Sequence, residues 1–410
     1  MIYTFFFPYI PPSGVSSLFA QLAQAIAERN TAKVRLVDFA HGAMARALVP
    51  GGRVELVEFE RDKRIIIGPG ETLVMQAEHA GKMRRQLEIH PEARMLLWQL
   101  HPYNFVPPLI PLIGQRDLWL RRPGLYRALM SHGLSPSMRN TVEFVTLAAR
   151  KKSLFFYDMP SLRTTEAFLG LQVPDSILLP VPVNVPPSQV RNGRIASDVL
   201  HVAWVGRLYD FKVHILVHLI RRLLAHARAS GKKVVLHVVG SGPKQALLEQ
   251  FGVGADGLKL VRHGDLPAPE LRKLLVEQVD VVASMGTAAL EGAALGLPVI
   301  LLDLAYSKVP PDYQFRWLFE AQGFDLGHTI TPADCNPGAD SFPAMMAVLE
   351  ESYPVLARRC HDYTRQNHSL DVVTTRFLEL APQAVLTYGD VPQRLWRKSW
   401  ARRLYDLARY

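Results

Sequence analysis

Short buried strands, polar turns and amphipathic helices alternate along the first half of the 410-residue chain. The opening MIYTFFFPY predicts a strand and PPSG a turn, and VSSLFAQLAQAIAERN then places apolar residues at helical spacing. Helical stretches separate several of the five strand candidates that follow: AKVRLVDF, RVELVEF, RIIIG, ARMLLWQL and KSLFFYD. Such alternation indicates βαβ units on a mostly parallel sheet.

The pattern breaks from Val173 to Ser197, where five prolines stand among polar residues. This composition can sustain neither a helix nor a central strand, so we predict a linker at residues 181–198. The alternation then resumes, with strands expected at VLHVAWVG, KVVLHVVG, LKLVRHG, VDVVAS and LPVILLD and helices at HILVHLIRRLLAHARAS and PKQALLEQFG. The predicted fold is α/β, with two doubly wound, Rossmann-like domains (1–180 and 199–385) facing across a cleft.

The last segment, residues 386–410, contains the basic aromatic sequence VPQRLWRKSWARRLYDLARY. Two interpretations stay open. The helix packs back on the joint between the domains, which is the commoner fate of such helices, or it lies on an anionic membrane surface. The segment QRDLWLRRPGLYRALM, residues 115–130, raises the same question in the first domain.

Composition narrows the class of protein. Hydrophobic residues make up 49% of the chain, as in a globular protein with large cores. The longest apolar tract, Val281–Asp303, is interrupted by Glu291 and Pro298, which argues against a membrane-spanning helix. Cys335 and Cys360 show neither metal-ligand nor disulfide-framework spacing, and the N-terminus is typical of a core strand rather than of a signal peptide. We therefore expect a cytoplasmic protein.

The chain carries a net charge of +10. An excess of this size favours an anionic partner, which could be a nucleotide, a nucleic acid or a phospholipid surface. A diffuse charge that only aids solubility is the alternative.

A first candidate site is WVGRLYDFK, in which a buried strand ends at Gly206 and Arg207 and Lys212 follow in the next turn. A diphosphate needs such a pair of cations, since Arg binds its oxygens in a bidentate fork and Lys adds a mobile point charge. Two surface cations beside a strand would look the same.

A second candidate is LHVVGSGPKQALLEQ, in which a strand runs into Gly240, Ser241, Gly242 and Pro243 before a helix. Glycines let backbone amides approach a ligand, and proline is tolerated in the first helical turn. Any tight turn between a strand and a helix would share this pattern.

The third candidate is the apolar tract VVASMGTAALEGAALGLPVILLD. Gly286 and Thr287 stand where the chain turns into a helix, so free amides and the helix dipole should face the cleft. Glu291 lies one helical turn beyond Thr287, and its carboxylate can accept two hydrogen bonds from a ribose diol. A solvent-facing glutamate is the alternative.

In the first domain, PPSGV joins the first strand to its helix and could place Gly14 against a phosphate or a sugar. WQLHPYN ends another strand, and its His101 could bond a sugar hydroxyl, transfer a proton, or serve only the structure. An Asp-x-Asp motif that could hold a divalent metal beside a diphosphate is missing from suitable places, so we expect no metal.

Together these motifs resemble the GT-B glycosyltransferases, most closely the retaining nucleotide-sugar enzymes of glycosyltransferase family 4. The resemblance runs through VGRL, VVGSGP, VRHGDLPAPELRKLLVEQVDVVAS and ALEGAALGLPVI, from Val205 to Ile300. This covers essentially the whole nucleotide-binding domain. The first domain is similar only in its glycine loop and strand order.

The resemblance implies that Arg207 and Lys212 bind the donor diphosphate and stabilise the charge left on it as the sugar departs. It implies that Glu291 binds the ribose, that amides around Gly286 and Thr287 cradle phosphate, and that the Gly240 loop borders the nucleotide. The donor would be a nucleoside diphosphate sugar, and neither a cofactor nor a metal would be needed. The acceptor, bound by the first domain, would be a cell-surface glycan or glycolipid intermediate at the inner membrane face.

One feature departs from the family, which usually has two glutamates eight residues apart. Eight residues before Glu291 stands Ala283, so the first acid, which contacts the donor sugar, is absent. The short turn is also similar to that of inverting GT-B enzymes that act on lipid-linked precursors, which leaves the stereochemistry open with retention favoured. Two alternatives are a sugar-nucleotide 2-epimerase and a non-catalytic sugar-nucleotide-binding relative. A nucleic-acid ligand would leave the Arg207, Lys212 and Glu291 set unexplained.

Overall fold

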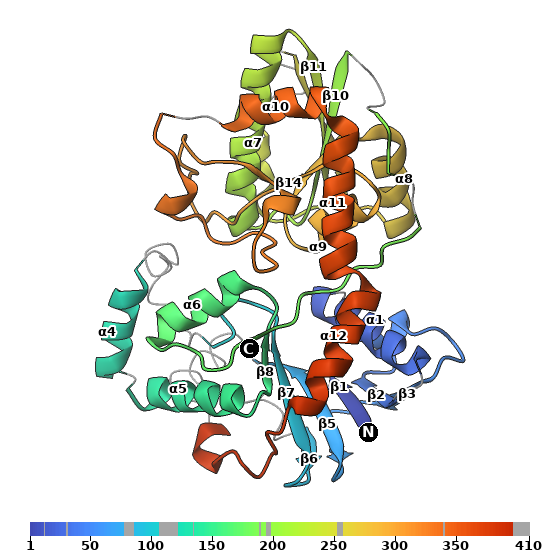
Figure 1. The fold of residues 1–410 in the computed structure, drawn as a ribbon, viewed down its shortest axis with the longest axis vertical. Helices are drawn as coiled ribbons and strands as arrows, with labels where there is room; N and C mark the ends of the chain where they lie inside the picture. Colours follow the sequence, from blue (N-terminus) through green and yellow to red (C-terminus); the bar gives the residue numbers. More distant parts are fainter. Residues whose placement is uncertain are drawn as a thin grey trace. The chain divides into compact units, whose positions relative to one another are not determined.

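The computed structural model describes residues 1–11, 13–29, 32–77, 86–105, 122–133, 135–187, 190–193, 198–251, 257–338 and 341–396. The chain divides into two compact units, one of Met1–Pro182 with Leu370–Tyr410 and one of Val183–Ser369 (Figure 1). None of the helices in these described ranges is both long and apolar enough to cross a membrane.

The first unit is built on a seven-stranded, fully parallel sheet of order β3-β2-β1-β5-β7-β8-β9. Its strands are β1 (Ile2–Phe6), β2 (Lys33–Asp38), β3 (Val54–Glu58), β5 (Glu71–Gln76), β7 (Arg94–Gln99), β8 (Leu154–Phe156) and β9 (Ile177–Leu178). Its helices are α1 (Gly14–Glu28), α2 (Ala43–Ala47), α4 (Pro123–Gly133), α5 (Ser135–Arg150), α6 (Met159–Leu169) and α12 (Leu370–Leu380). This is the predicted doubly wound arrangement.

Alternating side chains of β1 fill both faces of this sheet, which explains its uninterrupted run of aromatic residues. Phe5 packs against Phe19 of α1, with ring centroids 5.4 Å apart, and against Phe377 of α12 at 6.1 Å. Phe6 belongs to the core on the opposite face, where its ring lies 6.2 Å from that of Phe59. The hydroxyl of Ser13 caps α1 by accepting the amide of Ser16 at 3.1 Å.

Two expectations for the first unit differ from the structure. RIIIG forms β4 (Ile65–Ile67), but this strand pairs with β6 (Leu87–Ile89) in a separate two-stranded sheet. The central strand β5 was not among the predicted strands, because Glu71 and Gln76 at its ends look exposed. Both side chains are buried, and Glu71 bonds Thr4 at 2.7 Å and Arg35 at 2.8 Å.

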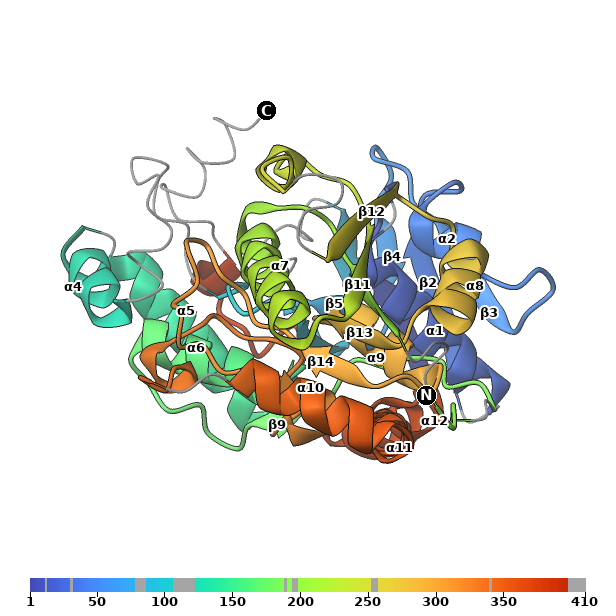
Figure 2. The ribbon, with the colours of Figure 1, turned by 90° about the horizontal axis from the view of Figure 1, so that it is seen from above.

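The second unit is built on a six-stranded sheet of order β12-β11-β10-β13-β14-β15, with β15 alone antiparallel to its neighbour. Its strands are β10 (Val199–Val205), β11 (Lys233–Val239), β12 (Leu258–Gly264), β13 (Val281–Ser284), β14 (Val299–Leu301) and β15 (Arg316–Trp317). Its helices are α7 (Asp210–Ser230), α8 (Ala268–Gln278), α9 (Thr287–Ala294), α10 (Ser341–Glu351) and α11 (Tyr353–His368). Figure 2 shows α7 on one side of β11 and β13 and α8 on the other.

All five strands predicted for this unit are present, and one helix is shorter than expected. PKQALLEQFG forms only a 3₁₀ turn, Gln245–Leu248, after a sharp bend in which the amide of Lys244 bonds the carbonyl of Leu208 at 3.1 Å. The bend uses residues that the predicted helix would have contained.

The predicted end of the second domain at residue 385 is wrong, since this unit ends at Ser369. Helix α12 belongs to the first unit, where it lies beside α1 (Figure 1) and Phe377 packs 5.3 Å from Tyr3. The chain after it stays on this unit, and Trp396 is buried 5.4 Å from Phe144. The described part of segment 386–410 thus packs on the first unit, while 397–410 and residues 115–121 lie outside the described residues.

Candidate functional site

Two turns of the second unit meet where the strand order reverses, between β10 and β13. In open α/β sheets, this switch point at the carboxyl ends of the strands is where ligands bind. The hydroxyl of Ser284, at the end of β13, donates a 2.7 Å hydrogen bond to the carbonyl of Val205, at the end of β10. This bond ties the turn of Gly206 and Arg207 to the turn that precedes α9.

The turn before α9 has a conformation that only glycine adopts easily, since Gly286 has φ 64° and ψ −146°. The amide of Gly286 was predicted to be free, but it donates a hydrogen bond to the carbonyl of Leu326 at 2.7 Å. The amides of Thr287 and Ala288 have no hydrogen-bond acceptor within the described chain. Two unbonded N–H groups therefore stand at the positive end of an eight-residue helix, which is a favourable place for an anion.

Helix α9 lies directly on the sheet, which explains its small residues. A Cβ added at Gly292 would come within 2.9 Å of the Val282 side chain on β13. Glu291, next to this contact, is exposed, and its carboxylate has no hydrogen-bond or ion-pair partner among the residues that the structure describes. Partial burial of its carboxyl raises the pKa, so the group would gain from a hydrogen-bonding ligand.

The two predicted cations lie on the other turn. Arg207 is exposed, and Lys212, in the first turn of α7, is half-buried. A Cβ added at Gly206 would lie 3.6 Å from the Lys212 Nζ, so the amine reaches back over the strand end. Burial and then the charge of Arg207 lower the pKa of Lys212. An anion between the two cations would relieve both effects.

The glycine loop after β11 packs closely against this turn. Gly240 and Gly242 let the loop pack against backbone, since added Cβ atoms would lie 2.1 Å from the Gly206 carbonyl oxygen and 2.5 Å from that of Leu208. Both donor groups of Ser241 are bonded to Asp265, which accepts the amide at 2.9 Å and the hydroxyl at 2.5 Å.

Ser241 thus has no free donor for a ligand, and the contact of this loop with a nucleotide stays a prediction. Pro243, which follows it, lies exposed before the bend.

The candidates of the first unit lie in two ordered turns. Gly14 opens α1, and the space around it would admit a Cβ without contact. His101 is exposed, its Nδ1 accepts the amide of Tyr103 at 3.2 Å, and the Asn104 side chain accepts the His101 amide at 3.1 Å. Their roles toward an acceptor stay predictions.

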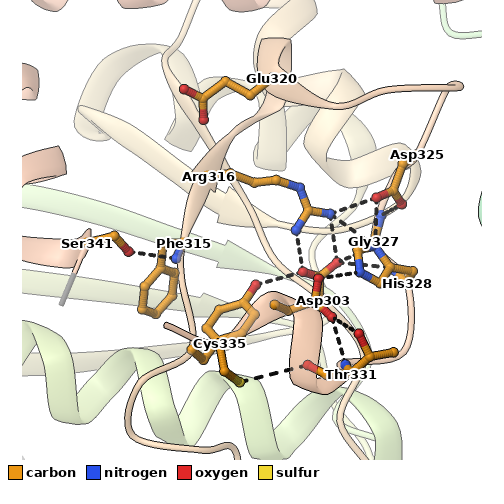
Figure 3. A network of polar contacts seen from close by, with 12 residues as sticks. Asp303, Phe315, Arg316, Glu320, Asp325, Gly327, His328, Thr331, Cys335 and Ser341 are labelled. Atoms are coloured by element: carbon orange, nitrogen blue, oxygen red, sulfur yellow. Dashed lines mark hydrogen bonds and ion pairs between the residues drawn. The ribbon is translucent and has the colours of Figure 1, made fainter. Parts of the chain in front are cut away.

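A polar network that the sequence did not suggest lies behind the α9 turn (Figure 3). Asp303, fully buried just after β14, accepts Arg316 Nη2 at 2.8 Å and the Tyr313 hydroxyl at 2.9 Å. Arg316 also bonds Asp325 at 2.8 Å. His328 joins through Nδ1 to Asp325 at 2.7 Å and through Nε2 to Asp334 at 2.9 Å.

The charges of this network settle its protonation. Burial by itself would lower the pKa of His328, but its bonds to Asp325 and Asp334 outweigh burial and raise the pKa to about 10. Burial likewise opposes ionisation of Asp334, and the His328 partner lowers the pKa of that carboxyl to about 2. The imidazolium is therefore formed at neutral pH and donates both of its N–H groups.

Asp303, Asp325 and His328 bring potential metal-ligand atoms within 4.8 Å of one another. The Arg316 guanidinium already binds both carboxylates, and a doubly protonated His328 offers no lone pair to a metal. The residues therefore do not fit a cation.

No protein-family model and no curated protein matches the sequence. Solved structures match it over most of its length. A glycosyltransferase from Rickettsia africae ESF-5 is 11% identical, covers 93% of this chain and 98% of its own, and gives a TM-score of 0.56. The lipopolysaccharide outer core galactosyltransferase WaaB, also 11% identical, has the same coverage and a TM-score of 0.51.

The pneumococcal O-GlcNAc transferase GtfA, solved with UDP and GlcNAc, is 9% identical over 93% of this chain and 98% of its own, with a TM-score of 0.50. At such identities the likeness concerns the fold. With its two Rossmann-like units, the first of which also takes in the segment after Ser369, this chain has the GT-B fold.

Proposed function

We propose that the chain is a glycosyltransferase that moves a sugar from a nucleoside diphosphate sugar to a hydroxyl group of an acceptor. The observation that carries this proposal is that helix α9 bears both free hydrogen-bond donors and a free acceptor. The unbonded amides of Thr287 and Ala288 favour an anion, whereas the unpartnered Glu291 carboxylate, one turn further on, needs hydrogen-bond donors. A nucleoside diphosphate supplies both, since its phosphates are anionic and its ribose presents two hydroxyls.

The same groups would serve the chemistry. As the bond between sugar and diphosphate breaks, negative charge builds up on the leaving phosphate. Arg207 and Lys212, with the amides of Thr287 and Ala288, are positive groups held in place before the reaction, and such groups stabilise developing charge best. We propose that this arrangement dispenses with a metal, and that the sugar is transferred with retention of configuration.

We further propose that the acceptor is a glycan or glycolipid intermediate of cell-surface polysaccharide synthesis, met at the cytoplasmic face of the membrane. WaaB, a lipopolysaccharide galactosyltransferase with this fold, supports that class of acceptor. The net charge of +10 suits a donor and a surface that are both anionic.

The test is the binding of UDP, GDP, ADP and dTDP by isothermal titration calorimetry, followed by Glu291→Gln with the best of them. A hydrogen bond to a charged group contributes about 1.5–3 kcal/mol, so the variant should bind at least about tenfold more weakly. The matching 2′-deoxynucleotide keeps only its 3′ hydroxyl as a partner of the carboxylate, so the substitution should weaken its binding less than that of the ribonucleotide. Glu270→Gln, an exposed glutamate on α8, is the matched control and should change nothing.

Equal losses of the ribonucleotide and the deoxynucleotide in Glu291→Gln would refute the ribose contact. Failure of the wild-type chain to bind any nucleoside diphosphate would refute the proposed function itself. Anomer-resolved NMR with the cognate nucleotide sugar then reports the reaction: transfer to an added acceptor is expected, and an epimer formed from the donor alone would overturn it.

A further inference from the structure

A backbone hydrogen bond from another loop fixes the residue that opens the turn with the unbonded amides. Gly286 donates its amide to the carbonyl of Leu326, and this carbonyl lies in the loop of residues 323–328. Three residues of the loop have left-handed backbone: Gly323 at φ 60°, Phe324 at φ 63° and Gly327 at φ 109°. Such a conformation costs a residue like Phe324 roughly 1–3 kcal/mol and persists only where the surroundings impose it.

Bonds on either side of Leu326 impose it here. Asp325 turns back to accept the amide of Gly327 at 2.8 Å, and Asp303 accepts the amide of His328 at 2.9 Å. The carbonyl of His328 accepts the amide of Leu304 at 2.7 Å. Gly327 packs tightly against the neighbouring backbone, because a Cβ added there would lie 2.5 Å from the Leu302 carbonyl oxygen.

Ion pairs hold the two aspartates that bond the loop. Arg316 joins Asp303 to Asp325 (Figure 3), and His328 joins Asp325 to Asp334. Both ring nitrogens of His328 and both carboxylate oxygens of Asp303 and of Asp325 are engaged. The network has little left to offer a ligand and can influence the turn only through the loop.

We propose that Asp303, Arg316, Asp325 and His328 are positioning residues of the donor site. They hold the Leu326 carbonyl at the place that orients Gly286, and so present the amides of Thr287 and Ala288 to a phosphate group of the ligand. This inference rests on the proposed binding of a nucleoside diphosphate. It adds that phosphate recognition depends on a cluster that does not touch the phosphate.

Asp325→Asn is the first test, because asparagine keeps the shape and the acceptor for Gly327 while removing the charge that binds Arg316 and His328. Affinities for UDP and for uridine are compared, or for GDP and guanosine if the wild-type chain prefers GDP. We expect the diphosphate to bind about tenfold more weakly and the nucleoside to bind within twofold of wild type. Circular dichroism at the assay temperature verifies that the variant is folded.

A second variant and a control separate positioning from stability. His328→Gln leaves the bonds of Arg316 to Asp303 and Asp325 in place. We expect it to weaken diphosphate binding about threefold and to leave nucleoside binding within twofold of wild type. Glu71→Gln breaks the ion pair with Arg35 in the first unit, so it should lower the melting temperature without changing either affinity.

A folded Asp325→Asn or His328→Gln with the wild-type ratio of diphosphate to nucleoside affinity would overturn the inference while leaving the proposed function intact. A wild-type chain that binds no nucleoside diphosphate would refute the proposed function and this inference with it.

Discussion

Acid should destabilise the second unit through one buried histidine. His201, His237 and His263 stand side by side on β10, β11 and β12 and form a hydrogen-bonded chain, with nitrogen–nitrogen distances of 3.1 and 3.0 Å. His237, in the middle, is 4% exposed. Burial and then the neighbouring His263 and His201 lower the pKa of His237 from 6.5 to about 4.

The direction and the size of this pH effect on stability follow from the linkage between proton binding and folding. Because the folded state resists protonation of His237, the unfolded state binds the proton first, so stability falls as the pH drops below 6.5. With one pKa unit equivalent to about 1.4 kcal/mol, the loss is about 2 kcal/mol between pH 7 and pH 5, and about 3 kcal/mol below pH 4. His328, whose pKa is raised, works in the opposite direction above pH 6, so wild type has to be compared with a variant.

His237→Gln is that variant, because glutamine keeps a donor and an acceptor in the chain but does not titrate. Hydrogen exchange followed by mass spectrometry gives the opening free energy of peptides from β10 and β11, which isolates the second unit. We expect wild type to lose about 2 kcal/mol more than the variant from pH 7 to pH 5. His41→Gln, an exposed histidine of the first unit, should leave the wild-type pH dependence unchanged. Parallel pH profiles of wild type and His237→Gln would refute the reasoning.

Two further predictions test the packing of the second unit. Gly240→Ala should lower the free energy of unfolding by several kcal/mol, because at φ 120° its Cβ would lie 2.1 Å from the Gly206 carbonyl oxygen. Gly264→Ala, which has open space around it at φ 66°, should cost only about 1 kcal/mol. Similar melting temperatures of the two variants in thermal unfolding would contradict the close approach at Gly240. At pH 8, Ellman's reagent should modify half-buried Cys335 within minutes and spare Cys360, whose burial raises its pKa to about 12, until denaturant is added; two fast thiols in the folded chain would contradict that burial.

The fold was largely predictable because both faces of each sheet are covered. Strands such as β1, β10 and β11 are then runs of apolar residues, and such runs are visible in the sequence. The prediction failed where a strand uses polar residues in buried positions. Glu71 at the start of β5 is buried only because Arg35 and Thr4, from two neighbouring strands, satisfy it, and no local pattern reports such partners.

The extent of the second unit was mispredicted for a related reason. Helix α12 follows α11 after the single residue Ser369, so continuity suggested one domain. The side chain that decides its place is Phe377, which fits against Tyr3 and Phe5 at the other end of the chain. An amphipathic pattern predicts a helix with a buried face but does not identify the sheet that buries it.

Some residues of the candidate site could be recognised from local sequence patterns and others could not. Arg207, Lys212 and Glu291 were recognisable since each is a polar residue at the end of a buried strand or in a small-residue helix, where a lone charge is conspicuous. The Asp303 network was not, because its members lie on separate segments between residues 303 and 334, and none of them repeats a spacing. Even the metal-like combination of two aspartates and a histidine is recognisable only once the fold brings it together.

The acid missing from the turn before α9 follows from how the turn is built. A longer turn could carry a carboxylate to the donor sugar, but this one passes from β13 to α9 through Met285 and Gly286 alone. Met285 is buried and Gly286 has no side chain, so neither residue of this turn offers a side chain to a ligand, and the glycine adds no stiffness of its own. Its orientation must therefore come from outside, and the Leu326 carbonyl supplies it. Asp303, which closes the same apolar tract, bonds the loop that bears this carbonyl, so one stretch of sequence provides both the turn proposed to bind the donor and part of its support.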